Sequence, residues 1–65
     1  MPIITVQMLE GRSLEQKREL VETLTREMAR ICGCSEAGIF VVIEESQYEN
    51  FGVGGKLCAD LYPKK

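Results

Sequence analysis

The sequence predicts an α/β fold of the α+β type, in which a βαβ unit with parallel strands is followed by a short C-terminal hairpin. Two observations predict it. Apolar, β-branched segments at residues 3–9 and 39–43 have the composition of strands, and the segment between them carries apolar residues at helical spacing. Strands joined through a helix run parallel with a right-handed crossover. We expect a single domain over residues 1–65.

The first strand is expected at residues 3–9, where side chains alternate between two faces. One face carries Ile4, Val6 and Met8, and the other carries Ile3, Thr5, Gln7 and Leu9. Because both faces are largely apolar, we expect the strand to be buried on most of both. Gly11 breaks the pattern and ends the strand.

The helix is expected to begin at a capping box, with Ser13 as the N-cap and Gln16 reaching back to the Ser13 amide. One stripe recurs at helical spacing and should face the sheet: Lys17, Leu20, Val21, Leu24, Met28 and Ile31. The solvent-facing side is marked by Arg18, Glu22 and Arg26. Gly33 is expected to end the helix as its C′ residue.

The second strand is expected at residues 39–43, a continuous apolar run between Gly38 and the acidic pair Glu44-Glu45. Such a run is typical of a strand in a sheet covered on both faces. The glycine-dense segment 51–55 predicts a turn that could form a short hairpin, followed by a brief helical or irregular end at residues 56–61. A phosphate-binding loop is disfavoured, because no long helix and no Lys-Ser or Lys-Thr pair follows the glycines.

The length of the chain predicts self-association. A domain of 65 residues buries only about 60% of the surface that its unfolded chain exposes. Disulfides are not expected, because the three cysteines are odd in number and the first residues do not resemble a secretory signal. The chain has no His, so no structural zinc is expected either. An apolar fraction of 45% therefore predicts an obligate homo-oligomer.

Charge and hydropathy exclude two classes of partner. The net charge is −2, and acidic and basic residues are interspersed, so the sequence has no basic stripe of the kind that binds a phosphate backbone. Nucleic acid is therefore not expected as a partner. No apolar run approaches the length of a membrane span. We expect a soluble, cytoplasmic protein without a membrane partner.

Pro2 and Arg12 are the residues that most suggest chemistry. If Met1 is removed, Pro2 becomes a free secondary amine, which no internal proline can supply. At the head of an apolar strand, desolvation lowers the pKa of this amine, and a cation such as Arg12 within reach would lower the pKa further. A neutral amine is a competent general base. Arg12 precedes the expected N-cap, where its guanidinium and the exposed helix amides could hold a carboxylate. The ordinary alternatives are an inert proline and a solvated loop arginine.

The Cys32-Gly33-Cys34 segment and the Glu44-Glu45 pair are interpreted as structural rather than catalytic residues. Cys32-Gly33-Cys34 could in principle capture a metal or exchange disulfides, but a redox pair normally is Cys-x-x-Cys at a helix N-terminus, and this pair sits at the other end. We interpret Cys32 and Cys34 as buried or half-buried cysteines. Glu44-Glu45 is interpreted as a solvated strand end or an inter-subunit salt-bridge partner.

These motifs together resemble the 4-oxalocrotonate tautomerase family over nearly the whole chain. The residues that carry the resemblance are Pro2, Leu9-Glu10-Gly11-Arg12-Ser13, Gln16-Lys17 and Phe51-Gly52-Val53-Gly54-Gly55. In that family the initiator Met is removed and the proline amine shuttles a proton between the enol oxygen of a 2-hydroxy-dienoate and a distant carbon. The resemblance implies that Pro2 is this base and acid, that Arg12 binds a substrate carboxylate and draws electron density toward it, and that Phe51 lines the pocket.

The resemblance also implies an assembly. Family members form hexamers, trimers of dimers, in which strands of two subunits join into one sheet and the C-terminal hairpin caps a neighbour. We therefore expect a homohexamer whose fold is completed by a shared sheet. No metal and no cofactor is expected.

One position departs from the family pattern. Members that convert dicarboxylates carry a second arginine at the start of the second strand, and the aligned residue here is Phe40. An aromatic ring cannot hold a second carboxylate, and loss of a charged hydrogen-bond donor typically costs about 1.5 to 3 kcal/mol. Phe40 instead favours a substrate with one carboxylate and an apolar end, such as phenylenolpyruvate.

The sequence thus predicts an enol-keto tautomerase, an isomerase, that acts on a small 2-hydroxy-alkenoate. Pro2 and Arg12 are its predicted catalytic residues, and Arg12, Phe40 and Phe51 its predicted substrate-binding residues. Three alternatives remain. They are a dicarboxylate 2-hydroxymuconate tautomerase, a hydratase or dehalogenase of small unsaturated acids, and a non-catalytic oligomeric module.

Overall fold

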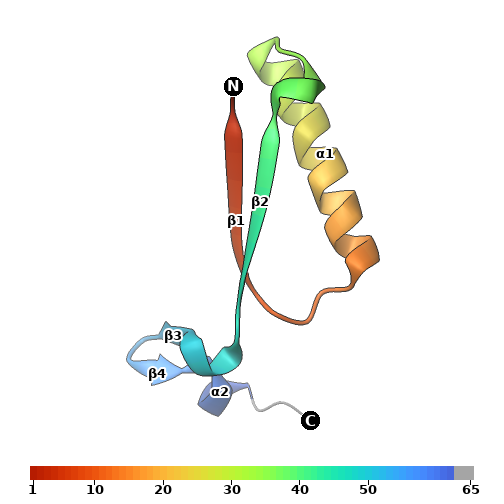
Figure 1. The fold of residues 1–65 in the computed structure, drawn as a ribbon. Helices are drawn as coiled ribbons and strands as arrows, with labels where there is room; N and C mark the ends of the chain where they lie inside the picture. The colour runs from red at the N-terminus through yellow and green to blue at the C-terminus, as the bar shows by residue number, and fades with distance from the viewer. Residues whose placement is uncertain (63–65) are drawn as a thin grey trace.

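The computed structural model describes residues 1–62 (Figure 1). Strand β1 (Ile3–Leu9), helix α1 (Leu14–Cys32) and strand β2 (Phe40–Ser46) form the predicted βαβ unit. A short 3-10 helix, η1 (Glu36–Gly38), leads into β2. The chain continues through η2 (Tyr48–Asn50), β3 (Gly52–Val53), β4 (Lys56–Leu57) and α2 (Cys58–Leu61). The predicted α+β architecture with its C-terminal hairpin is confirmed.

Strands β1 and β2 pair in parallel along their full length, as their connection through a helix requires. Backbone hydrogen bonds extend the pairing beyond both ends. The Phe40 amide donates to the Pro2 carbonyl oxygen at 3.1 Å, and the Glu10 amide donates to the Ser46 carbonyl oxygen at 3.0 Å. The backbones of Pro2 and Glu10 are therefore fixed to the sheet at its two opposite ends.

The acidic pair Glu44-Glu45 lies inside β2 rather than beyond it, so the prediction that the strand ends at residue 43 is wrong. Each carboxylate has a partner on a neighbouring element. Gln7 on β1 donates to Glu44 Oε1 at 3.0 Å, and Lys17 Nζ on α1 lies 2.6 Å from Glu45 Oε1. These partners allow the strand to continue through two acidic residues.

Both predicted ends of α1 are confirmed. Ser13 Oγ accepts a hydrogen bond from the Gln16 amide at 3.1 Å, and the Ser13 amide donates to Gln16 Oε1 at 2.9 Å. Gly33 adopts the left-handed conformation, with φ 65° and ψ 38°. The amides of Gly33 and Cys34 both donate to the Ala29 carbonyl oxygen, at 2.9 and 3.2 Å. Some of the backbone amides at the start of the helix and some of the carbonyls at its end therefore have hydrogen-bond partners.

The last apolar residue of the predicted stripe does not face the sheet. Ile31 is 70% exposed, whereas Leu20, Val21, Leu24 and Met28 are half-buried. The 19 residues of α1 span about 29 Å at 1.5 Å per residue, and the seven of β1 span about 23 Å at 3.3 Å per residue. The last turn of α1 therefore extends past the sheet, and the prediction for Ile31 is wrong.

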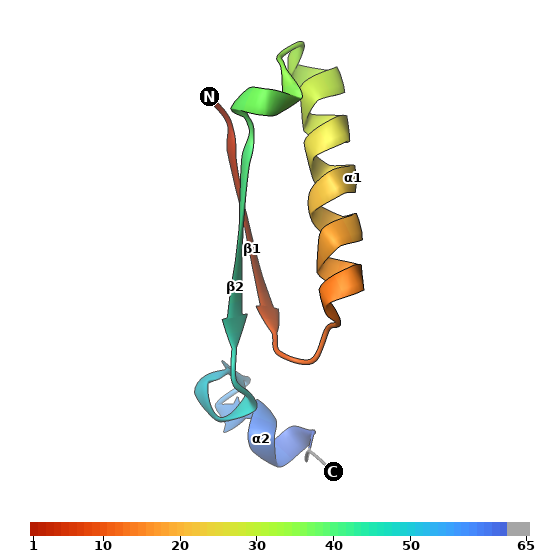
Figure 2. The same cartoon turned by 45° about the vertical axis from the view of Figure 1, so that its right-hand side comes forward.

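Only one face of the two-stranded sheet is covered. Figure 2 shows α1 along one side of the β1–β2 pair. On the other side, Ile3, Phe40 and Val42 are 64%, 49% and 43% exposed. The expectation that both strands are covered on both faces is therefore wrong for a single chain, because the chain has no second layer on that side.

The chain alone has little core and an elongated shape. Among residues 1–62, Ile39 and Cys58 are the hydrophobic residues that are buried. The radius of gyration is 15.0 Å, whereas a compact domain of this length has about 11 Å. The accessible surface is 5110 Å², against about 4,200 Å² for a compact monomer of this mass. Both comparisons favour the predicted need for further copies of the chain.

The glycine-dense segment forms the predicted turn. Strands β3 and β4 pair antiparallel, and Gly54 and Gly55 between them have φ of 62° and 85°, which residues with a Cβ rarely adopt. Residues 56–57, predicted as helical or irregular, form β4 because they pair across this turn. The hairpin leads into α2, where the Cys58 amide donates to the Phe51 carbonyl oxygen at 2.7 Å.

The three cysteines are free thiols in different surroundings. Cys58 is 2% exposed. Cys32 and Cys34 are exposed, so their interpretation as buried or half-buried residues is wrong for the single chain. The cause is the position of α1, whose last turn projects beyond the sheet. Within residues 1–62, no helix has the length and apolar character needed to cross a membrane.

Candidate active site

Pro2 lies directly before β1 and is half-buried. Its carbonyl oxygen accepts the hydrogen bond from the Phe40 amide, so the backbone of Pro2 is fixed to the start of β2. Met1 precedes it as an exposed residue and occupies the proline nitrogen in a peptide bond. Removal of Met1 would leave the amine at a well-defined position at one end of the sheet.

Arg12 lies in the connection between β1 and α1, at the opposite end of the sheet. Gly11 before it has φ of 123°, a conformation that favours glycine at this sharp change of direction. Within residues 1–62 no hydrogen bond or ion pair engages the Arg12 guanidinium, whereas Arg18 and Arg30 are paired to Glu15 and Glu27. Arg12 is therefore available to an external anion.

Arg12 also lines a small hollow of about 200 Å³. The other residues that line it are Met8, Gln16, Lys17 and Leu20. The second cation of this hollow, Lys17, is held by Glu45, so its charge is balanced within the chain. The hollow thus offers one unpaired guanidinium next to mainly apolar walls, which suits a carboxylate attached to an apolar group.

The two predicted aromatic residues lie at different ends. Phe40 begins β2, next to Pro2, and its side chain is on the uncovered face of the sheet. Phe51 is exposed, follows η2, and lies directly before β3. Each aromatic side chain is therefore accessible, one near the proline and one beyond the other end of the sheet.

The four predicted residues thus form two pairs that a single chain keeps apart. Pro2 and Phe40 lie at the end where β1 and β2 begin, and Arg12 and Phe51 follow the ends where these strands finish (Figure 1). The seven residues of β1 alone separate these ends by about 23 Å at 3.3 Å per residue. One small substrate cannot touch both Pro2 and Arg12 of the same chain, so the sequence-based expectation that Arg12 is within reach of Pro2 does not hold inside one chain.

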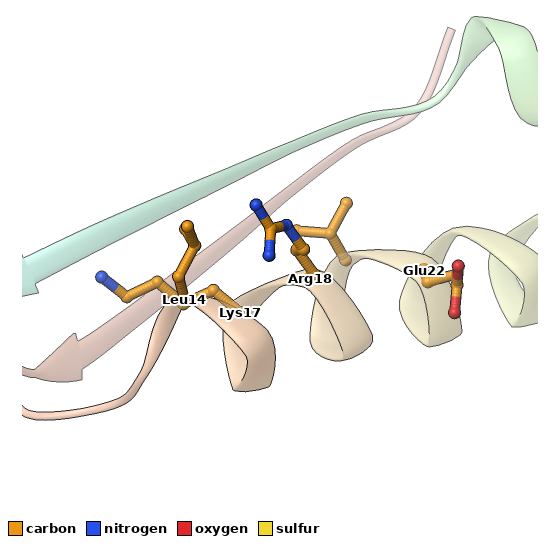
Figure 3. A pocket seen from close by; sticks show the side chains of 5 residues that line it. Leu14, Lys17, Arg18 and Glu22 are labelled. Carbon is orange, nitrogen blue, oxygen red and sulfur yellow. The ribbon is translucent and has the colours of Figure 1, made fainter.

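A larger hollow of about 560 Å³ lies along the first half of α1 and contains none of the four predicted residues (Figure 3). Its lining residues are Leu14, Lys17, Arg18, Val21 and Glu22. Both cations are engaged, Lys17 by Glu45 and Arg18 by Glu15. This hollow was not predicted from the sequence, although Leu14, an apolar residue beside the predicted polar face of the helix, is a signal for it. Its paired cations and open apolar wall suit packing rather than proton transfer.

A metal centre built from the usual donors is not present in the described part of the chain. Among residues 1–62, no three His, Cys, Asp or Glu side chains lie close enough to hold a metal ion.

Comparisons with known proteins match nearly the whole chain. A family model described as "Tautomerase enzyme" matches residues 2–61. The 2-hydroxymuconate tautomerase of Bacillus subtilis strain 168 is 48% identical over 61 residues, which cover 94% of this chain and 98% of the relative. The crystal structure of a 4-oxalocrotonate tautomerase homologue superposes with a TM-score of 0.89 at 37% identity, over 92% of this chain and 95% of the other. The heterohexameric 4-oxalocrotonate tautomerase of Chloroflexus aurantiacus J-10-fl superposes with a TM-score of 0.88 at 36% identity, over 94% and 98%.

Proposed function

This chain belongs to the tautomerase family, and from that premise we propose that it interconverts the enol and keto forms of a small 2-hydroxy-alkenoate. It is an enzyme of the isomerase class by virtue of that membership. The observation that carries the proposal is the family match, which starts at Pro2 and extends through the hairpin to residue 61. The substrate and the roles of individual residues are our proposals, argued below.

Pro2 is proposed as the group that moves the proton. After removal of Met1, its neutral amine accepts the proton of the enol hydroxyl and delivers a proton to a carbon of the conjugated chain. The electron pair of the O–H bond becomes the second bond of the C=O group, the conjugated C=C electrons shift to form the new C–H bond, and the product is the keto isomer. General acid-base transfer of this kind typically contributes about 10²- to 10⁴-fold. The half-buried position of Pro2 at the head of an apolar strand supports this role, because desolvation favours the neutral amine.

Arg12 is proposed to bind the substrate carboxylate. Its guanidinium is unpaired within residues 1–62 and lies next to the apolar hollow. It precedes a capped helix N-terminus, whose partial positive charge adds to the attraction for an anion. As the enol ionises, negative charge spreads toward the carboxylate, so a fixed cation there stabilises the transition state more than the ground state.

The complete site is proposed to form between chains. Since Pro2 and Arg12 lie at opposite ends of one chain, a partner placed antiparallel along the sheet would bring its Arg12 end beside Pro2. The free edges of the two-stranded sheet and its exposed apolar face supply the surface for such pairing. We propose a homohexamer built as a trimer of dimers, in which each dimer shares one sheet and holds two equivalent sites. The heterohexameric neighbour supports a six-chain assembly.

Phe40 is proposed to select substrates with a single carboxylate. Its backbone amide is bonded to the Pro2 carbonyl oxygen, and its exposed ring offers an apolar wall where a second cation would be needed for a diacid. A monocarboxylate such as phenylenolpyruvate fits this arrangement. The name of the Bacillus subtilis relative favours a second candidate, the diacid 2-hydroxymuconate.

A panel of enols decides between these substrates. We expect a higher kcat/KM for phenylenolpyruvate than for 2-hydroxymuconate in ketonisation assays with the Met1-processed protein. The reverse order would support the diacid instead. Halide release from a haloacrylate, or water addition to an unsaturated acid, would identify the dehalogenase or hydratase alternative. Absence of turnover with every member of the panel would support a non-catalytic module.

A further inference from the structure

Three sulfur-bearing residues that the proposed reaction does not use lie at or just after the C-terminal end of α1. Cys32 Sγ lies 3.4 Å from Met28 Sδ, one helical turn earlier, and Cys34 follows two residues later. We propose that Met28, Cys32 and Cys34, here called the sulfur cluster, bind a soft monovalent cation, namely Cu(I). The sulfur cluster lies toward the end of the molecule where β1 and β2 begin, the end that also carries Pro2, and the proposal does not depend on the proposed function.

The backbone keeps the two cysteines together. Gly33 in the left-handed conformation reverses the chain, and the Cys34 amide donates to the Ala29 carbonyl oxygen at 3.2 Å, which returns Cys34 to the last turn of α1. Two residues span at most about 7 Å between Cα atoms even when extended, and this turn is not extended. The backbones of Cys32 and Cys34 are therefore held at the same end of the helix by ordinary backbone hydrogen bonds.

The sulfur cluster is accessible to a cation. Cys32 and Cys34 are exposed in the single chain, so an ion can reach them from solvent, while the half-buried Met28 provides the inner side of the site. The one basic residue of the last turn, Arg30, is paired to Glu27 at 2.8 Å, so its charge is balanced locally.

The donor set selects the ion. Thiolate and thioether sulfurs are soft ligands that favour Cu(I), and three of them suit a three-coordinate ion. Zinc sites need four donors, and residues 1–62 contain no group of three His, Cys, Asp or Glu side chains able to hold a metal. With metal–sulfur bonds of about 2.3 Å, two sulfurs on a trigonal ion stand about 4 Å apart. The Met28–Cys32 pair, at 3.4 Å, needs to open by only about half an ångström.

Cu(I) binding exchanges protons for one metal ion and leaves the site with one more negative charge. The thiols of Cys32 and Cys34 release two protons, the Met28 thioether donates a lone pair without losing one, and one Cu(I) enters. No electron is transferred, so the step requires no oxidant or reductant beyond what keeps the copper in the Cu(I) state.

The test is an anaerobic titration of the reduced, folded protein with Cu(I), in competition with the chelator bathocuproine disulfonate. We expect one Cu(I) per chain, with the near-ultraviolet absorption of a thiolate-to-Cu(I) charge transfer and three sulfur neighbours in X-ray absorption at the copper edge. Cys32→Ser and Cys34→Ser should each weaken the competition at least 10- to 100-fold, since loss of even an outer-shell partner costs that much. Zn(II) should not replace Cu(I).

A matched pair of methionine variants tests the third donor. Met28→Leu removes the sulfur and keeps the size of the side chain, so it should weaken Cu(I) binding about 10-fold. Met8→Leu makes the same change on β1, away from the sulfur cluster, and should leave binding unchanged. Circular dichroism and size-exclusion chromatography on every variant check that the fold and assembly are intact. Wild-type protein that fails to compete with the chelator, or equal binding by the Cys32→Ser/Cys34→Ser double variant, would overturn the proposal.

Discussion

The backbone amide of Phe40 donates a 3.1 Å hydrogen bond to the carbonyl oxygen of Pro2. The proposed base and the proposed apolar wall are thus held together by a bond that involves neither side chain. Substitutions at either position leave this bond in place, provided that the new residue at position 40 keeps its amide. Activity changes in such variants therefore report on chemistry and recognition rather than on loss of the sheet.

Pro2→Ala should lower kcat for enol ketonisation by about 10² to 10⁴, because the secondary amine that moves the proton is lost. Stopped-flow absorbance of the enol measures the rate. A version of the wild-type chain that retains Met1, verified by intact mass, is the companion variant and should be equally slow, because its proline nitrogen is blocked. Full activity in the Met1-retaining protein would rule out the amine as the base.

Arg12→Ala should lower kcat/KM for acid enols by about 10- to 150-fold, the equivalent of losing a charged hydrogen bond of about 1.5 to 3 kcal/mol. Enols without a carboxylate should react as before. Arg26→Ala is the matched control, since Arg26 is an exposed arginine on the solvent side of α1, and it should match wild type with both substrates. Equal losses on acid and neutral enols would contradict the carboxylate role.

Phe40→Arg should shift the substrate preference toward diacids. The added guanidinium offers a second carboxylate a bidentate partner beside Pro2, and we expect the ratio of kcat/KM for 2-hydroxymuconate to that for phenylenolpyruvate to rise at least about tenfold. Phe40→Leu keeps the site apolar and should leave the ratio nearly unchanged. Because the Phe40 side chain is 49% exposed in the single chain, neither change should empty a core.

Co-refolding a mixture of Pro2→Ala and Arg12→Ala chains tests whether the site is shared. Half of randomly formed dimers would contain one chain of each kind, and one of their two sites would be fully wild type, so about a quarter of wild-type activity should return. Each variant refolded alone should remain slow. A mixture no more active than its components would show that both residues of a site come from one chain.

Gly33→Ala should destabilise the assembly by about 1 to 2 kcal/mol, because a residue with a Cβ is strained in the left-handed conformation that Gly33 adopts. Gly38→Ala is the control: its φ is not positive, and an added Cβ there meets nothing within 4 Å. Chemical denaturation at one fixed protein concentration provides the comparison, since the stability of an oligomer depends on concentration. Similar losses for both variants would contradict the strain argument.

Local signals in the sequence were sufficient for both ends of α1 and for the pairing of β1 with β2. The Ser13–Gln16 capping box and the Gly33 stop are short-range patterns with one structural solution, and both ends of α1 follow them. The parallel pairing of β1 and β2 follows from a helical connection between two apolar segments. The family resemblance rests on motifs of the same local kind.

Long-range geometry could not be predicted in the same way. The pairing of Lys17 with Glu45, which keeps an acidic residue inside β2, joins positions 28 residues apart and leaves no local pattern. The exposure of Ile31 depends on the difference in length between a helix and a strand. The separation of Pro2 from Arg12 arises only once β1 is known to run straight between them. A sequence motif can therefore identify the residues of a site, but it does not give the distance between those residues within one chain.

The division of the site between the two ends of β1 has a consequence for evolution. If each site is shared as we propose, then after a gene duplication one copy can lose its Arg12 end and the other its Pro2 end without loss of all activity. Selection would then act on the pair, and the two unlike chains would become dependent on each other. Because the two ends of the chain carry different groups of one shared site, two unlike subunits can each supply one of these groups.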